Sequence, residues 1–320
     1  MKTYDLLIIG GGPAGVAAGV YASRKKLQTI LVTEDFGGQS IVSDGIENWI
    51  GTVKISGIDL AKSLESHLRA YAGDVVEIKT GNRIISIEKH TDYTETNALF
   101  ISKMKNTSGD ETVEVVSKAV LITTGSAHRK LGATGADIFE HKGLTYCATC
   151  DGPMFGGTDV VVIGGGNAAL ESVAQLSAYC KSVTILNRSK TFRADPITVE
   201  KVLSKPNVNL ITPAEVTEVK GEKFVNGLSY KNTETGEIHE LATNGIFVEI
   251  GMIPATGFVK DIVKLNEYNK VVVDPMTQRT ETSGIWAAGD CTDGLYHQNN
   301  IAVGDAVKAL EDIYMSLSRR

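Results

Sequence analysis

The chain has 320 residues, 42% of them hydrophobic, and its 32 basic and 38 acidic residues give a net charge of −6. This length favours two domains, and the acidic balance argues against a general nucleic-acid-binding surface. No segment has the roughly 18 to 20 apolar residues that a membrane span needs, and four cysteines are too few for a secreted disulfide scaffold. We therefore expect a cytoplasmic protein that binds neither membranes nor nucleic acid.

The chain begins with the pattern of a nucleotide-binding βαβ unit. Residues 5–9 are a short apolar run typical of a buried parallel strand, and residues 28–33 read as the next strand. Between them, glycines allow a tight turn, a close approach to a pyrophosphate, and close packing of a helix on the sheet. Glu34, about 20 residues on, stands where an acid binds a ribose hydroxyl, with Thr33 beside it. The candidate ligands in the turn are Gly10, Gly12, Pro13, Ala14 and Gly15.

The same pattern returns in the second half of the chain. A strand is expected at 158–163, a helix at about 167–179 and another strand at 182–186. The candidate ligands of this second turn are Gly164, Gly166, Asn167 and Ala168, with alanine at 169 in the place of the third glycine. Two fingerprints so far apart predict a duplicated nucleotide-binding domain.

The remaining strands and the last helix fit an α/β fold. Strands at 84–87 and 98–102 and a strand-rich stretch at about 208–241 look like β-meanders, one for each unit. Apolar strands at 119–125 and 245–251 end in glycine, another buried strand is expected at 284–290, and 301–317 has the apolar spacing of a closing helix. We predict two Rossmann-like domains, each with a β-meander.

No acid ends the second strand of the second unit. The segment there carries Arg188, Lys190 and Arg193. Cations would pair with a 2′-phosphate that an acid would repel, so this loop favours NADPH. A solvated basic loop without a ligand is the alternative.

A Cys-x-x-Cys pair lies between the two fingerprints. Cys147 and Cys150 precede Asp151, and a carboxylate there could give and take the protons of a dithiol. Structural zinc needs about four ligands, which the isolated Cys180 and Cys291 do not supply, so no metal is expected. A redox-active disulfide is the preferred interpretation, because helix N-termini lower thiol pKa values.

These motifs, in this order and over residues 4–315, resemble the low-molecular-weight thioredoxin reductases of bacteria and archaea. Residues 147–152 are similar to the redox centre of that family. The resemblance implies FAD, with Asp290 at its ribityl or pyrophosphate part and Gln39, Asn48 and Gln298 along the flavin. The other residues of these FAD-associated regions are Gly38, Thr124, Gly125, Gly289, His297 and Asn299.

The family also implies a discontinuous flavin domain, residues 1–126 and 252–320, with an inserted NADPH domain, residues 127–251, that carries the dithiol. The last third of the chain resembles the flavoprotein subunit of alkyl hydroperoxide reductase as well, which has an additional thioredoxin-like domain. We therefore expect a separate thioredoxin or thioredoxin-like protein to accept the electrons, and a homodimer as in the family.

Two positions depart from the family pattern. Asn187 and Ser189 stand where the family has a histidine and its second arginine, and His297 stands where an arginine is common. The expected activity is that of a thioredoxin-disulfide reductase, with electrons passing from NADPH through FAD and the dithiol to the partner. The alternatives are a flavoprotein of the same fold that ferredoxin or another donor reduces, a dithiol oxidase that uses oxygen, and a non-enzymatic nucleotide sensor.

Overall fold

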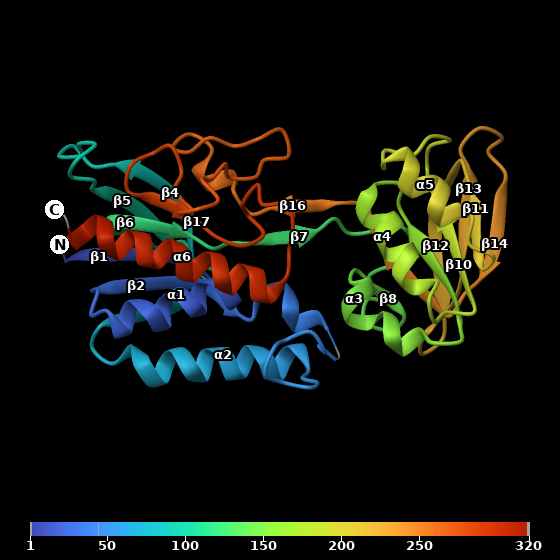
Figure 1. Cartoon of the computed structure of the whole chain (residues 1–320), viewed down its shortest axis with the longest axis horizontal. Helices are drawn as coiled ribbons and strands as arrows, with labels where there is room; N and C mark the ends of the chain where they lie inside the picture. Colours follow the sequence, from blue (N-terminus) through green and yellow to red (C-terminus); the bar gives the residue numbers. More distant parts are fainter. Residues whose placement is uncertain (1, 44, 319–320) are drawn as a thin grey trace. The chain divides into compact units, whose positions relative to one another are not determined.

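A computed structural model describes residues 2–43 and 45–318 of the chain. Contacts divide the chain into two compact units, which Figure 1 colours along the sequence. Unit 1 comprises Met1–Val42, Trp49–Ala127 and Ile253–Arg320, and unit 2 comprises Ser43–Asn48 and His128–Met252. Each unit has a parallel sheet with helices, so the predicted two-domain Rossmann-like fold is confirmed.

A seven-stranded sheet forms the centre of unit 1. Its strands follow the order β3-β2-β1-β6-β5-β4, and β17 pairs with β6. The parallel part contains β1 (Thr3–Gly11), β2 (Thr29–Phe36), β3 (Val76–Thr80), β6 (Thr112–Ile122) and β17 (Ile285–Ala287), and the antiparallel meander adds β4 (Asn82–Lys89) and β5 (Phe100–Asn106). The long strand β6 joins the two parts, because it pairs with β1 on one side and with β5 on the other.

Alternate residues of the central strands feed two cores in unit 1. Leu6 and Ile8 of β1 face the helices, whereas Leu7 and Ile9 face the meander. The helices are α1 (Pro13–Arg24), α2 (Gly57–Ala72) and α6 (Asn299–Ser318), with 3-10 turns η1 (Gly38–Val42) and η3 (Gly257–Val259). A side chain at Gly19 of α1 would come within 2.7 Å of Leu68 in α2, so the small residues of α1 let the two helices approach closely.

Unit 2 repeats this plan with a smaller sheet of order β11-β10-β9-β15-β8. Its parallel strands are β8 (Leu144–Thr145), β9 (Asp159–Ile163), β10 (Ser182–Leu186), β11 (Val208–Ile211) and β15 (Gly245–Val248). Its helices are α3 (Ala148–Asp151), η2 (Gly152–Phe155), α4 (Asn167–Leu176) and α5 (Pro196–Leu203). A meander of β12 (Ala214–Gly221), β13 (Val225–Asn232) and β14 (Ile238–Ala242) completes the unit.

The chain passes between the units at two short strands, β7 (Ser126–His128) and β16 (Met252–Pro254), which pair with each other. The strands that the sequence predicts in the two βαβ units are all present. One difference is that 208–241 does not form a single strand-rich meander, because β11 instead extends the parallel sheet beside β10. Within residues 2–43 and 45–318, no helix is both long and apolar enough to cross a membrane.

Candidate functional site

The first glycine turn is held tightly against its neighbouring strand. Gly10 has a φ of +117°, and a side chain there would overlap the carbonyl oxygen of Thr123 at the end of β6. The Thr123 hydroxyl donates a hydrogen bond to the carbonyl oxygen of Ile9 at 2.8 Å. The sequence therefore needs glycine at this corner, both for its backbone conformation and for the close contact of two strands.

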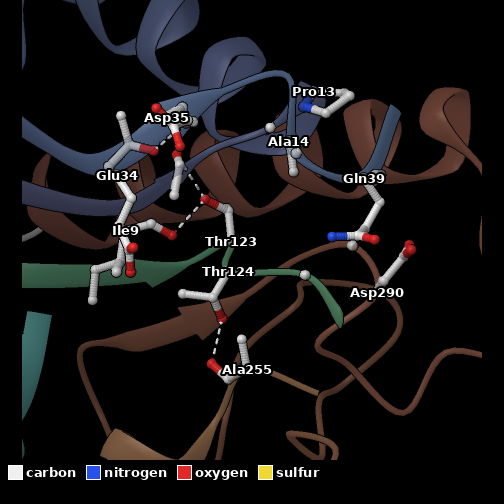
Figure 2. A pocket seen from close by; sticks show the side chains of 18 of the residues that line it. Ile9, Pro13, Ala14, Glu34, Asp35, Gln39, Thr123, Thr124, Ala255 and Asp290 are labelled. Atoms are coloured by element: carbon white, nitrogen blue, oxygen red, sulfur yellow. Dashed lines mark hydrogen bonds between the residues drawn. The ribbon is translucent and has the colours of Figure 1, made fainter. Parts of the chain in front are cut away.

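This turn opens into a cavity of about 580 Å³ within unit 1. That volume lies in the usual range of small-molecule sites. Figure 2 shows Glu34 at one end of the cavity and Gln39 and Asp290 at the other, with Thr123 and Thr124 between them. Of the residues predicted to bind FAD, those that line the cavity are Gly10, Gly12, Pro13, Ala14, Thr33, Glu34, Gly38, Gln39, Thr124, Gly125, Gly289, Asp290 and Asn299.

The turn end of the cavity suits a dinucleotide. Helix α1 begins after Gly12, and no side chain in the described part of the chain caps its first N–H groups, so they can bind the oxygens of a pyrophosphate. The exposed carboxylate of Glu34 follows β2 and can accept hydrogen bonds from ribose hydroxyls. Thr33 instead donates its hydroxyl to the carbonyl of Asp35 at 2.5 Å. The donor set and the narrow glycine corner fit FAD.

A short polar chain lies at the other end of the cavity. His297 has its Nδ1 3.6 Å from Oδ1 of Asp290 and its Nε2 2.5 Å from Nζ of Lys270. A lysine ammonium only donates, so Nε2 of His297 accepts. Burial lowers the pKa of Lys270. His297 thus contacts Asp290 although it does not itself line the cavity.

Three further predicted residues do not line this cavity. Gly15 lies in α1 behind the turn, where it packs against Gly10. Gln298 immediately precedes α6, and Asn48 belongs to the segment Ser43–Asn48, which the contacts group with unit 2 rather than with the predicted flavin domain. Their role towards FAD remains a prediction.

The Cys-x-x-Cys pair begins helix α3 in unit 2. Cys147 and Cys150 form a disulfide, and both residues are partly exposed. Cys147 is the N-cap residue, and its Sγ accepts a hydrogen bond from the backbone N–H of Cys150 at 3.1 Å. Two sulfurs at a helix start that reach the surface can exchange with the disulfide of another molecule.

Asp151 is buried at the end of α3. Its carboxylate accepts hydrogen bonds from the hydroxyls of Thr145, on β8, and Ser43 (3.1 Å for Ser43). Its backbone N–H donates to the carbonyl of Cys147 at 3.0 Å, so the acid is held in the same turn as the sulfurs. Sequence reasoning found Asp151 but missed both hydroxyls, since Ser43 is 108 residues away and carries no local signal.

The other two cysteines are structural. Cys180 in unit 2 and Cys291 in unit 1 are buried, and burial raises the pKa of each thiol to about 11. A thiol with such a pKa is almost entirely protonated at neutral pH and is a poor nucleophile. This agrees with the expectation that both are packing residues.

The second glycine turn repeats the corner of the first. Gly164 has a φ of +147°, and a side chain there would overlap the carbonyl oxygen of Glu249, just after β15. The predicted ligands Gly166, Asn167 and Ala168 lie at the start of α4, where Gly166 is the N-cap without a side-chain hydrogen bond. Its first N–H groups can therefore bind an anion.

The loop after β10 folds over this second turn. The backbone N–H of Arg193 donates to the carbonyl of Gly165 at 2.8 Å. The buried Asn187 uses its side-chain amide to donate to the carbonyls of Ser189 (2.7 Å) and Thr191 (3.1 Å). The contacts bring the basic loop of Arg188, Lys190 and Arg193 to the turn, and all three side chains are exposed.

A titrating carboxyl group lies on the second turn. Burial raises the pKa of Glu249 to about 7, and the Ser172 hydroxyl, which donates to Oε1 at 2.7 Å, opposes that rise. At neutral pH this carboxyl group therefore exists partly as the neutral acid. Sequence reasoning missed Glu249, because a glutamate inside an apolar strand gives no sign of its burial.

The comparisons with known proteins place this fold and these motifs in one family. The family model described as "Pyridine nucleotide-disulphide oxidoreductase" matches residues 4–306, and the chain belongs to this family. Among solved structures, the thioredoxin reductase of Streptococcus pyogenes MGAS5005 is similar with a TM-score of 0.87 and 32% identity, over 99% of both chains. The thioredoxin reductase of T. acidophilum is 36% identical over 99% of this chain and 100% of that one, with a TM-score of 0.66.

The curated relatives are longer proteins. An NADH dehydrogenase of Bacillus subtilis is 36% identical over 96% of this chain but 57% of its own length. A component of the alkyl hydroperoxide reductase of Pseudomonas putida is 38% identical over the same two shares. The chain therefore spans somewhat more than half the length of these relatives. It is an oxidoreductase and a flavoprotein of the thioredoxin reductase type, with a flavin and a nicotinamide cofactor.

Proposed function

We propose that this chain is a thioredoxin-disulfide reductase that passes electrons from NADPH, through FAD and the Cys147–Cys150 pair, to a thioredoxin-like protein. The observation that carries the proposal is the partly exposed disulfide at the start of α3, in the same unit as a second dinucleotide turn. The solved thioredoxin reductases that match this chain along its whole length support it. The homodimer remains an expectation from the family resemblance.

The residues of unit 1 would hold the FAD. Glu34 would accept hydrogen bonds from the ribose, the first N–H groups of α1 would bind the pyrophosphate, and Asp290 would lie at the ribityl or pyrophosphate part. Bound there, FAD would supply a carrier that takes two electrons as hydride from a nicotinamide and gives them to a disulfide.

The residues of unit 2 would perform the thiol chemistry. Two electrons break the Cys147–Cys150 bond, and the sulfurs leave as a thiolate and a thiol. Cys147 would then attack the disulfide of the partner, and Cys150 would resolve the mixed disulfide, so that the pair is again oxidised and the partner carries two thiols. Asp151, held by Thr145 and Ser43, would give a proton to the leaving sulfur and take one back.

The substitution Cys150→Ser tests this assignment. We expect NADPH still to bleach the flavin, because neither dinucleotide turn changes, while thioredoxin reduction falls by at least about 100-fold because a covalent intermediate cannot be completed. The measurement is NADPH-dependent reduction of thioredoxin beside stopped-flow absorbance of the flavin. Cys180→Ala is the matched control, since it also removes one sulfur of unit 2 and should leave turnover intact. Normal turnover by Cys150→Ser would overturn the proposal.

A further inference from the structure

The position that usually carries an acid for the ribose is used for another purpose in unit 2. Asn187 follows β10 directly, and its side chain is buried and spends its amide on two carbonyl groups of its own loop. The loop is thus held in shape by Asn187, which has no carboxylate to offer to a 2′-hydroxyl. The discrimination between the two nicotinamide dinucleotides has to come from other side chains near this loop.

A second segment, distant in the sequence, contacts the same loop. The turn between β13 and β14 presents Thr233, whose hydroxyl donates to the carbonyl of Arg188 at 3.5 Å and whose N–H donates to the carbonyl of Pro213 at 3.2 Å. Thr212 holds the loop from the adjoining side through Ser189, at 2.6 Å. The next residue of the turn, Glu234, is fixed by its own N–H, which donates to Oδ1 of Asn232 at 2.9 Å.

Glu234 therefore brings a negative charge to the basic loop. Its Oε1 lies 2.7 Å from Nζ of Lys190, and both side chains are more than half exposed. Arg188 and Arg193 are exposed as well, and neither guanidinium pairs with a carboxylate within residues 2–43 and 45–318. Of the three cations at this site, one is neutralised by its neighbour and two keep their charge.

We propose that Glu234 is a specificity-determining residue that weakens the preference of this site for a 2′-phosphate. A phosphate dianion that approaches the loop meets two arginines, but it also meets a carboxylate, and Lys190 must leave Glu234 before it can bind the phosphate. A 2′-hydroxyl carries no charge and bears neither cost. The inference rests on the proposed function, because it concerns the dinucleotide that reduces the enzyme, and it makes NADH a competent donor beside NADPH.

The test is calorimetric binding of 2′,5′-ADP and 5′-AMP to the FAD-loaded protein. We expect Glu234→Gln to bind 2′,5′-ADP about tenfold more tightly, a change of 1.4 kcal/mol, and 5′-AMP within about twofold of the unchanged protein. Glu237→Gln is the matched control: it removes the same charge from the same turn, where Glu237 lies near His239 instead of Lys190. The ratio of kcat/KM for NADPH and NADH should move in parallel.

Two different outcomes would count against the inference. An unchanged affinity of Glu234→Gln for 2′,5′-ADP, or an equal change for both ligands or in both variants, overturns the role of Glu234 and leaves the proposed function standing. If the unchanged protein binds neither ligand and neither dinucleotide reduces its flavin, the proposed function fails and this inference fails with it.

Discussion

The two glycine turns of this protein have the same backbone plan and different surroundings. In both, the first glycine has a positive φ and lies against a carbonyl oxygen of the neighbouring strand, from Thr123 in unit 1 and from Glu249 in unit 2. The strand after the helix then ends in an exposed acid, Glu34, in unit 1, and in a buried amide, Asn187, in unit 2. The repeated scaffold sets where a dinucleotide can lie, and the residues around it set which one binds.

The third position of the two turns differs most in what it tolerates. A side chain at Gly15 would overlap the carbonyl oxygen of Gly10, whereas the equivalent residue of unit 2 is already Ala169. We expect Gly15→Ala to cost several kcal/mol and to lower the flavin content at least about tenfold, because the helix must move away from the turn. The flavin-to-protein absorbance ratio and the melting temperature measure this.

The reverse exchange, Ala169→Gly, is the control for that experiment. It opens no clash and should cost only about 1 kcal/mol through helix propensity, with the flavin retained. A flavin content in Gly15→Ala equal to that of the unchanged protein would show that the two turns do not differ in the way their geometry indicates.

A smaller effect is expected at the residue beside each first glycine. Thr123 is neutral, whereas burial raises the pKa of Glu249 to about 7, above its ordinary value of 4.5. Between those two values the folded state keeps a proton that the unfolded state loses, so the group costs stability progressively as the pH rises, and the full cost is present above about pH 7. Glu249→Gln should therefore stabilise the protein by about 1–2 kcal/mol at pH 8 and hardly at pH 4.5.

Melting curves across this pH range provide the measurement. The partial exposure of Glu249 to solvent is the reason to expect less than the pKa shift alone would give. Glu200→Gln, an exposed glutamate on α5, is the control that should change little at either pH. A stability difference between Glu249→Gln and the unchanged protein that is the same at pH 4.5 and pH 8 would contradict the raised pKa.

Sequence patterns predicted the local parts of both units. Apolar runs bounded by glycine placed β1, β9 and β10, and small residues at helical spacing placed α1. Helix α2 was not predicted, although Ser56 caps it by accepting from the N–H of Asp59 at 3.1 Å, a pattern that was present in the sequence. Local signals are sufficient where one segment makes its own structure.

Long-range contacts explain what the sequence could not supply. Glu234 reaches Lys190 only because the meander of unit 2 folds its turn onto the loop after β10. Ser43 reaches Asp151 only because residues 43–48 leave their sequence neighbours and group with unit 2. Burial also converts Glu249 from an ordinary acid into one that titrates near neutrality. Spacing along the chain carries no record of these contacts.

The central claim is that a dinucleotide and the Cys147–Cys150 pair exchange electrons within one protein. An anaerobic titration of the purified yellow protein with NADPH, with thiols counted at each step, tests it most directly. The account predicts that about two equivalents of NADPH are consumed per chain, one for the flavin and one for the disulfide, and that thioredoxin added afterwards takes the electrons. Consumption of one equivalent without new thiols, or of none, would contradict the account, and the latter would point to another electron donor.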